Sequence, residues 1–102
     1  MDVKKEIIYR QIGAKVAYYR TLRGLTQEAL AKKMNVSRST ISRIEQGKYN
    51  RSISLDILLD LADGLRIECS SLLTFSDLEK RMWWDFDDMA DVTDDGDDAG
   101  KQ

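Results

Sequence analysis

The sequence predicts an all-α fold, a compact domain of five helices followed by an acidic tail. Along most of the first 75 residues, apolar side chains recur at spacings of three and four, which is the period of a helix with one buried face. The chain of 102 residues contains no proline, so its helices have to end at glycines and at capping residues. No segment shows the strict alternation of a half-buried strand. We therefore expect helices alone, joined by short loops.

The first helix is expected over residues 5–23. The residues of its apolar stripe are Ile8, Ile12, Val16 and Tyr19. Gly24 follows the stripe directly. A glycine in this position readily takes the left-handed conformation that closes many helices, so we expect the first helix to end there.

Two shorter helices are expected on either side of a tight turn. The hydroxyls of Thr26 and Ser37 can each cap the first turn of a helix by accepting from a free backbone N–H. Asn35 lies between these helices and tolerates the left-handed backbone of a tight turn. The second helix of the pair is expected over residues 38–46, before Gly47. The residues of the pair that are expected to face the core are Ala31, Val36, Ile41 and Ile44.

A fourth helix is expected over residues 55–63, capped by Ser54 and closed by Gly64. The residues expected on its inner side are Leu55, Leu58, Leu59 and Ala62. The segment from Ile67 to Phe75 is expected to form a final apolar turn or short helix that docks on the core.

The chain is expected to divide into a domain over residues 1–75 and an aromatic, acidic tail over residues 76–102. The segment LEKRMWWDFDDM can continue as a helix. The apolar residues near one face of that helix are Leu78, Met82, Trp83, Phe86 and Met89. After Ala90 the sequence cannot bury an apolar face, so we expect the end of the tail to be disordered.

The residue types exclude several kinds of site. The chain has one cysteine, Cys69, and no histidine, which excludes an intrachain disulfide, a His/Cys zinc site and a catalytic Ser-His or Cys-His pair. No apolar run approaches the ~20 residues of a membrane span, and the N-terminus lacks the apolar core of a signal peptide. We expect a cytoplasmic protein that is not an enzyme and needs no metal or cofactor.

The net charge of -2 conceals two oppositely charged parts. Residues 1–74 hold 13 Lys and Arg against 8 Asp and Glu, a net charge of +5. Residues 75–102 hold 3 against 10, a net charge of -7. A basic body with an acidic tail is typical of a protein whose body binds a polyanion.

Residues 25–46 carry the clearest indication of function. In a helix-turn-helix, a tight turn holds a short polar helix so that it can enter a groove of DNA. The outward side of helix 38–46 bears hydrogen-bond donors and no carboxylate, as a surface that reads base edges requires. The residues of this side are Arg38, Ser39, Ser42 and Arg43, with Thr40 beside them. We therefore predict a DNA-binding helix-turn-helix.

The stretch from Ile12 to Phe75 resembles the lambda-repressor-like helix-turn-helix regulators of the Cro and XRE type. The resemblance depends on LTQEALAKKMNVSRSTISRIEQGK, followed by SLDILLDLADGLRIECSSLL, and it covers about two-thirds of the chain. Asn35 stands where the family usually has glycine, a mild departure because asparagine tolerates positive φ.

The resemblance implies which residues contact DNA. Arg38, Ser39 and Arg43 would face base edges in the major groove, where an arginine fork matches the O6 and N7 acceptors of guanine. Ser42 lies on the same outward side. Sugar and phosphate contacts would fix the register without reading sequence. The residues expected to make them are Thr26, Gln27, Ser37, Thr40, Lys48, Asn50 and Arg51.

The resemblance also implies how the DNA-reading helix is held. Arg20 and Glu45 match a structural ion pair of this family, which joins the first helix to the third. Gln27 would brace a side chain of the third helix in addition to holding a phosphate. These residues would orient the third helix.

These observations predict a sequence-specific, double-stranded-DNA-binding transcriptional regulator that represses as a homodimer on an operator with two half-sites. A dimer is expected because one short helix reads too few base pairs to be selective.

Several alternatives remain at this level. Residues 25–46 could be an ordinary hairpin in a structural helix bundle. The aromatic residues of the tail could pack on the domain, join a dimer contact or grip a protein partner, as an antitoxin or anti-repressor partner would. The carboxylates of residues 85–98 could hold a divalent metal ion, but no core fixes their geometry. The acidic end is either a solubilising tail or a weak competitor of DNA for the basic body.

Overall fold

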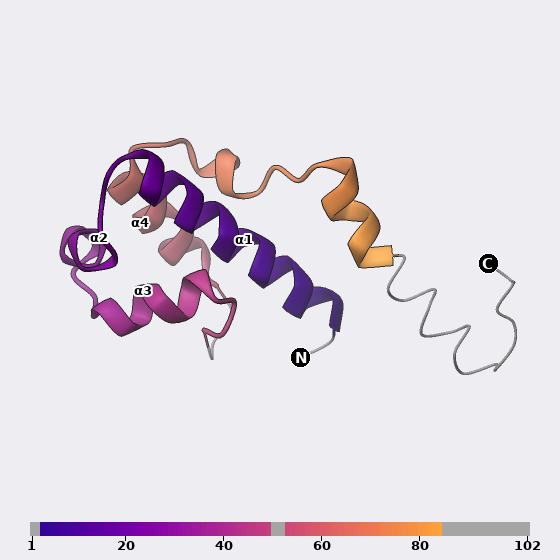
Figure 1. Cartoon of the computed structure of the whole chain (residues 1–102), viewed down its shortest axis with the longest axis horizontal. Helices are drawn as coiled ribbons and strands as arrows, with labels where there is room; N and C mark the ends of the chain where they lie inside the picture. The colour runs from indigo at the N-terminus through magenta and orange to yellow at the C-terminus, as the bar shows by residue number, and fades with distance from the viewer. Residues whose placement is uncertain (1–2, 50–52, 85–102) are drawn as a thin grey trace, which may run out of the picture. The chain divides into compact units, whose positions relative to one another are not determined.

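The computed structural model describes residues 3–49 and 53–84, and these residues form helices and loops without a β-strand (Figure 1). Four α-helices and one 3-10 helix follow in order: α1 Val3–Leu22, α2 Gln27–Met34, α3 Arg38–Glu45, α4 Leu55–Leu65 and η1 Cys69–Leu72. A further helical segment covers residues 77–84. The predicted all-α, five-helix fold is confirmed. Among the described residues, no helix has the length and apolar character needed to cross a membrane.

The chain forms two compact units. One unit is Tyr9–Thr74, and the other contains the described residues of the ranges 1–8 and 75–102. The first turns of α1 thus group with the C-terminal segment, whereas the sequence placed them with the helical domain. The division into domains at residue 75 stays a prediction.

The helix ends follow the capping residues that the sequence indicates. The Oγ1 of Thr26 accepts from the backbone N–H of Ala29 at 3.0 Å, and Ser37 and Ser54 cap α3 and α4 in the same way. Asn35 has φ 58° and ψ 45°, so the turn between α2 and α3 is made by a left-handed asparagine, as predicted. Gly24, with φ 73°, follows α1, which begins two residues earlier and ends one residue earlier than expected.

The prediction for α4 is wrong in two respects. Leu55 is 65% exposed and Leu59 is 47% exposed, while the buried leucines are Leu58, Leu61 and Leu65. These three positions follow the helical period i, i+3, i+7, which a sequence with leucine on every side leaves ambiguous. The helix also continues past Gly64, and Arg66 with φ 58° ends it.

Gly64 is a packing residue inside α4. A Cβ at this position would lie 2.8 Å from Cδ1 of Leu30, which is fully buried in α2. The glycine therefore lets α4 approach α2 closely, and the chain ends the helix two residues later, at Arg66. Arg23 supports that end, because its Nε donates to the carbonyl oxygen of Leu65 at 2.9 Å.

The core lies between the helices of the Tyr9–Thr74 unit. Its buried apolar residues are Ile12, Val16, Leu30, Ala31, Ile41, Ile44, Leu58, Leu61, Ala62, Leu65 and Leu72. Leu72 belongs to η1, which packs against α4 and confirms the predicted final apolar turn. Val36 is 38% exposed and is not the core anchor that the sequence suggested, because it follows the left-handed turn residue and precedes α3.

The second unit contains a small aromatic cluster. Trp83 meets Phe75 and Trp84 edge to face, with ring centroids 5.1 and 5.2 Å apart. The Nζ of Lys4 lies 5.3 Å from the centre of a Trp84 ring, a favourable cation–π distance. Leu78 and Met82 are exposed, and Phe86 and Met89 lie outside the described residues. A protein partner on this segment stays a prediction.

Candidate nucleic-acid interface

The end of α3 is held by a hydrogen-bonded brace of three side chains. The Nε of Arg20 donates to Oε2 of Glu45 at 2.6 Å, and Nη2 of Arg20 donates to Oε1 of Glu45 at 3.1 Å. Gln27, the first residue of α2, adds a hydrogen bond from Nε2 to the same Oε1 at 3.0 Å. One carboxylate thus connects α1, α2 and α3. The brace, meaning Arg20, Gln27 and Glu45, fixes the helix that carries the predicted DNA contacts.

The brace is largely shielded from water. The Arg20 side chain is 17% exposed and the Glu45 side chain is 7% exposed. Hydrogen bonding to Glu45 raises the pKa of the Arg20 guanidinium above its ordinary value, against the opposing effect of burial. The guanidinium also donates through Nη1 to the carbonyl oxygen of Leu25 at 2.8 Å, which ties α1 to the loop just before α2.

Two glycines allow α1 to lie directly on the end of α3. A Cβ on Gly13 would lie 2.6 Å from the carbonyl oxygen of Glu45, so only glycine fits between the two backbones. A Cβ on Gly47, whose φ is 71°, would lie 2.8 Å from Cα of Arg10. Backbone contact at Gly13 and side-chain bonding at Arg20 therefore position α3 against α1 along two turns of the helix.

The structure separates α3 into an inner and an outer side. Ile41 and Ile44 are buried, with 0% and 1% of their surface exposed. Arg38, Ser39 and Arg43 are exposed, and Ser42 is half-buried. The structure therefore places the four predicted base-reading residues on the outer side of one helix, away from the apolar anchors.

The hydroxyl groups of α3 form a local network. The Oγ of Ser37 accepts from the backbone N–H of Thr40 at 3.1 Å and lies 3.1 Å from Oγ of Ser39 and 2.9 Å from Oγ1 of Thr40. One turn further on, Nε2 of Gln46 donates to Oγ of Ser42 at 3.1 Å. The first turn of α3 thus presents several hydroxyls that lie within hydrogen-bonding distance of one another.

The remaining predicted contact residues lie near this surface or outside the described part of the chain. Thr26 is exposed at the start of α2. Lys48 is exposed just after α3, and its backbone N–H donates to the carbonyl oxygen of Arg43 at 2.8 Å. Asn50 and Arg51 lie outside the described residues.

Two residues that support the site, Gly13 and Gln46, and one that supports the end of α4, Arg23, escaped the sequence analysis. Gly13 received no role, although a glycine within an otherwise regular stripe is a sign of close backbone approach. Gln46 follows Ser42 by four residues, a spacing that brings two side chains of a helix together. Arg23 gave no local signal, because its acceptors are 42 and 43 residues away in the chain.

A helix-turn-helix family model (HTH_3) matches residues 16–72, which include α2, the turn, α3, α4 and η1. The match spans more than half of the chain, and the chain belongs to this family of DNA-binding transcription regulators.

Related proteins carry the same description. An uncharacterized HTH-type transcriptional regulator of Methanocaldococcus jannaschii is 52% identical over 54 residues, which cover 53% of this chain and 82% of that protein. A second one, from Archaeoglobus fulgidus, is 42% identical over 65 residues, covering 64% of this chain and 90% of that protein.

Solved structures share the fold. The restriction-modification controller protein C.AhdI from Aeromonas hydrophila has a TM-score of 0.56 and 37% sequence identity, over 61% of this chain and 91% of that chain. The clp gene regulator ClgR from Corynebacterium glutamicum has a TM-score of 0.61 at 21% identity, over 84% of this chain and 86% of that chain, which shows similarity of fold alone.

Proposed function

We propose that this protein binds double-stranded DNA sequence-specifically, with α3 in the major groove, and that it represses transcription as a homodimer. One observation carries the proposal. The single carboxylate of α3, Glu45, accepts three hydrogen bonds in the brace, so the outer side of α3 offers donors and hydroxyls and no free negative charge. Such a surface suits the negative potential and the acceptor-rich base edges of a DNA groove.

The two arginines of α3 supply the direct readout. Arg38 and Arg43 are exposed and lie five residues apart. An arginine fork bonds to O6 and N7 of guanine in the major groove, and a good pair contributes about 1–3 kcal/mol of discrimination. Ser39 and Ser42 add short hydroxyls that can contact an adjacent base. We therefore assign base reading to Arg38, Ser39, Ser42 and Arg43.

The residues around α3 supply the contacts that set its register. Thr26 and Ser37 lie at the N-termini of α2 and α3, where backbone N–H groups favour a phosphate. Gln27 and Thr40 lie beside these caps, and Lys48 brings a positive charge after α3. Asn50 and Arg51 are assigned to phosphate by resemblance to the family. These contacts raise affinity for all DNA sequences equally.

The homodimer is inferred from the size of α3. Its eight residues span about 12 Å, which reaches only a few base pairs. Two copies on half-sites about one helical turn apart would roughly double the contact energy and give the selectivity that a regulator needs. Repression follows if such a dimer occupies a promoter and excludes the polymerase.

Selection of bound sequences from a pool of random duplex DNA tests the proposal. We expect enrichment of two related half-sites with a fixed spacing of about 10 base pairs or a multiple of it. The double variant Arg38→Ala/Arg43→Ala should lose the enriched sequence, whereas Lys32→Ala/Lys33→Ala, which removes the same charge from the end of α2, should retain it. Enrichment of no sequence, or an unchanged sequence with the arginine variant, would show that the assigned surface is wrong.

A further inference from the structure

We propose that the protein binds the phosphate group of a small ligand in a basic hollow between the α1–α2 loop, α2 and the end of α4. The basic hollow has a volume of about 170 Å³, and its lining residues are Arg23, Leu25, Lys33, Gly64, Leu65 and Arg66. This volume is below the ~300–1,000 Å³ of sites that enclose drug-sized ligands, so it suits a small anion or the phosphate end of a larger molecule. The inference goes beyond the proposed function, since none of the described residues with a predicted DNA contact lines the hollow.

The charge of the lining favours an anion. Three of the side chains are cations, those of Arg23, Lys33 and Arg66, and among the described residues no aspartate or glutamate lines the basic hollow. Within residues 3–49 and 53–84, the ammonium of Lys33 and the guanidinium of Arg66 have neither an ion pair nor a hydrogen-bond partner. Like charges that gather without a counterion repel one another, and an anion between them relieves the repulsion.

Arg23 is held in place and keeps its charge. Its Nε donates to the carbonyl oxygen of Leu65 at 2.9 Å, and its Nη2 donates to that of Arg66 at 2.6 Å. Both acceptors are neutral, so the positive charge of the guanidinium is not compensated, and Nη1 makes no hydrogen bond within the described part of the chain. A cation that is held before the ligand arrives loses less conformational freedom on binding.

Arg66 occupies a backbone position that suits other residue types better. Its φ of 58° lies in the left-handed region, which glycine and asparagine take more easily than arginine. The chain therefore keeps a long cationic side chain at a strained position, in the same hollow as Arg23 and Lys33. Strain of this kind gathers at ligand sites. Binding of a ligand by the Arg66 side chain accounts for it.

The chemistry of the lining matches phosphate. An arginine fork bonds to two oxygens of a phosphate group, and an ammonium group adds a charge-assisted hydrogen bond. The other lining residues, Leu25, Gly64 and Leu65, are buried or half-buried and have no polar side-chain atom. Electrostatic attraction is stronger beside such a surface than in open water. A phosphate dianion therefore gains more here than a carboxylate with a single charge.

Two carboxylates lie close enough to modulate this attraction. Asp60 and Asp63 line a neighbouring hollow, which shares Lys33, Gly64 and Arg66 with the basic one. In the described part of the chain, neither carboxylate forms an ion pair with Lys33 or Arg66. Their negative charge opposes an anion nearby. Removal of one carboxylate should therefore raise the affinity for phosphate.

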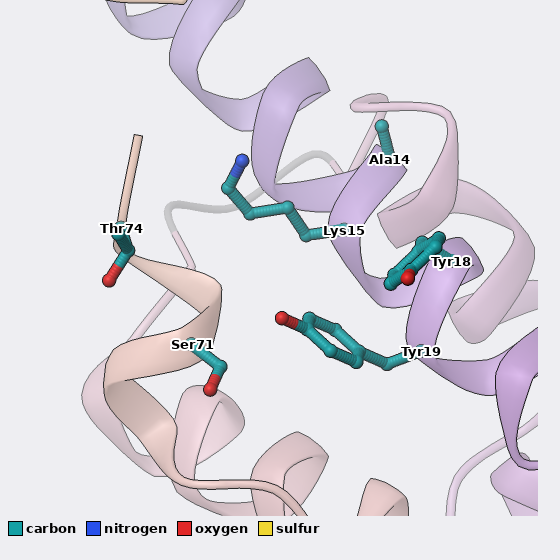
Figure 2. A pocket seen from close by; sticks show the side chains of 6 residues that line it. All are labelled: Ala14, Lys15, Tyr18, Tyr19, Ser71 and Thr74. Carbon is teal, nitrogen blue, oxygen red and sulfur yellow. The ribbon is translucent and has the colours of Figure 1, made fainter. Parts of the chain in front are cut away.

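A larger hollow of the same unit does not offer an available cation. It has a volume of about 490 Å³ and lies between α1 and the η1 segment, with Lys15, Tyr19, Ser71 and Thr74 among its lining residues (Figure 2). Lys15 already has an interaction partner, and Oγ1 of Thr74 donates to the carbonyl oxygen of Ser70 at 2.8 Å. The basic hollow is therefore the site that we assign to an anion.

Titration of the ¹⁵N-labelled full chain with inorganic phosphate, at constant ionic strength and without DNA, tests the proposal. We expect saturable shifts of the Arg23 Nε signal and of the backbone amide signals of Gly64 and Arg66 in NMR spectra. Acetate, which has a single charge, should bind about tenfold more weakly, as expected for the loss of a charge-assisted hydrogen bond. Shifts that do not saturate, or that acetate produces equally, would overturn the assignment of a phosphate site.

Single substitutions separate the basic hollow from the rest of the surface. Arg66→Asn removes the charge and keeps a residue that tolerates positive φ, so it should weaken phosphate binding about tenfold. Asp63→Asn should strengthen binding about two- to fivefold, the effect of one exposed charge. Lys15→Met and Lys32→Met remove the same charge elsewhere and should leave binding unchanged. An unchanged affinity of Arg66→Asn, or a lowered affinity of Asp63→Asn, would overturn the proposal.

Duplex DNA is the competing source of phosphate groups. We expect inorganic phosphate to bind with the same affinity before and after a duplex is added, because the proposed DNA contacts lie on and around α3. Loss of phosphate binding on addition of the duplex would show that the basic hollow holds the DNA backbone, and the proposal of a small ligand would be wrong.

Discussion

Arg20 and Glu45, which are 25 positions apart in the chain, meet through two parallel hydrogen bonds of 2.6 and 3.1 Å. The fork of the guanidinium matches the two oxygens of the carboxylate, a geometry that lysine cannot reproduce. The pair fixes the orientation of α3 from the side that does not face solvent.

Removal of one partner should therefore destabilise the protein and move α3. Arg20→Met leaves a carboxylate that is 7% exposed without its cation, and we expect a loss of about 3 kcal/mol in the free energy of unfolding. Urea denaturation followed by circular dichroism measures this. The double variant Arg20→Met/Glu45→Met should recover part of the loss, and a loss equal to the sum of the single variants would show that the two residues act independently.

The pH dependence should distinguish arginine from lysine in the brace. Because the pKa of Arg20 is raised in the folded state, the stability that it contributes is fully present below its unfolded pKa and is lost only as the pH rises through the still higher folded value. Arg20→Lys replaces it with a group whose ordinary pKa is ~10.4. The difference in unfolding free energy between the two proteins should widen as the pH rises past that value, in urea titrations at pH ~8 and ~11. A constant difference would contradict the charged character of the brace.

Gly13 should be intolerant of even one methyl group. Gly13→Ala places a Cβ 2.6 Å from the carbonyl oxygen of Glu45 and 2.9 Å from its carbonyl carbon, which are backbone atoms that cannot rotate away. We expect a loss of about 2 kcal/mol by urea denaturation, although alanine is the better helix former. Gly64→Ala is the matched control, because its Cβ would meet the end of the flexible Leu30 side chain, and its cost should be smaller. An equal loss of unfolding free energy in Gly13→Ala and Gly64→Ala would show that contact with backbone atoms is no more costly than contact with a side chain.

Glycine at position 66 should stabilise the protein. Arg66 has φ 58°, a conformation that costs a non-glycine residue about 1 kcal/mol. Arg66→Gly should raise the melting temperature by a few degrees, since the hydrogen bond from Arg23 goes to the backbone carbonyl oxygen of residue 66 and remains. Gly24→Arg is the reverse change, at a position where φ is 73° and nothing lies within 4 Å of a Cβ. This variant should lower the melting temperature by a similar amount. A melting temperature of Arg66→Gly below that of the unchanged protein would show that the Arg66 side chain makes a stabilising contact of its own.

Arg43 and Lys48 should differ in how their loss affects DNA binding. Arg43→Ala should relax the preference at one base position of the selected sequence, at a cost of about 1–3 kcal/mol for the preferred base. Lys48→Ala should weaken binding to all sequences alike and reduce the dependence of affinity on salt by about one counterion. Fluorescence anisotropy with the selected duplex and a scrambled one, at several salt concentrations, separates the two outcomes. Identical behaviour of the two variants would contradict the assignment of base reading to Arg43.

Deletion of residues 87–102 should tighten nonspecific DNA binding at low salt. This segment holds seven aspartates and one lysine, so its removal takes away a net charge of -6. We expect the acidic chain to compete with phosphate for the basic body, and salt to screen this competition as ionic strength rises. The comparison is made by anisotropy with random-sequence duplex in low and high salt. Unchanged affinity in low salt would contradict this competition, and solubilising the protein would remain as the role of the tail.

The sequence predicted the features of this fold that depend on neighbouring residues. Thr26, Ser37 and Ser54 cap the helices, because a hydroxyl at the N-cap position acts within three residues. Asn35 makes the left-handed turn because asparagine tolerates positive φ. The resemblance to a known family supplied the Arg20–Glu45 pair, which no local pattern indicates.

The features that the sequence did not predict depend on distant partners. Leu59 and Leu61 have the same chemistry, and only the direction of packing of α4 decides that Leu61 is buried and Leu59 is half-exposed. Gly13 and Gly64 are needed because atoms of α3 and α2, respectively, lie too close to leave room for a side chain. The roles of Arg38, Ser39, Ser42 and Arg43 stay a prediction, because the identity of the base opposite each residue is a property of the DNA.

The bare backbone contact at Gly13 and the closed brace at Glu45 hold α3 from its inner side, and neither involves Arg38 or Arg43. If α3 reads DNA as we propose, substitutions at Arg38 or Arg43 should therefore change which operator is preferred while the brace and the backbone contact are kept. A lineage of such proteins could acquire new target genes through two or three exchanges on one helix, and a designer could use the same positions to redirect the protein without rebuilding its core.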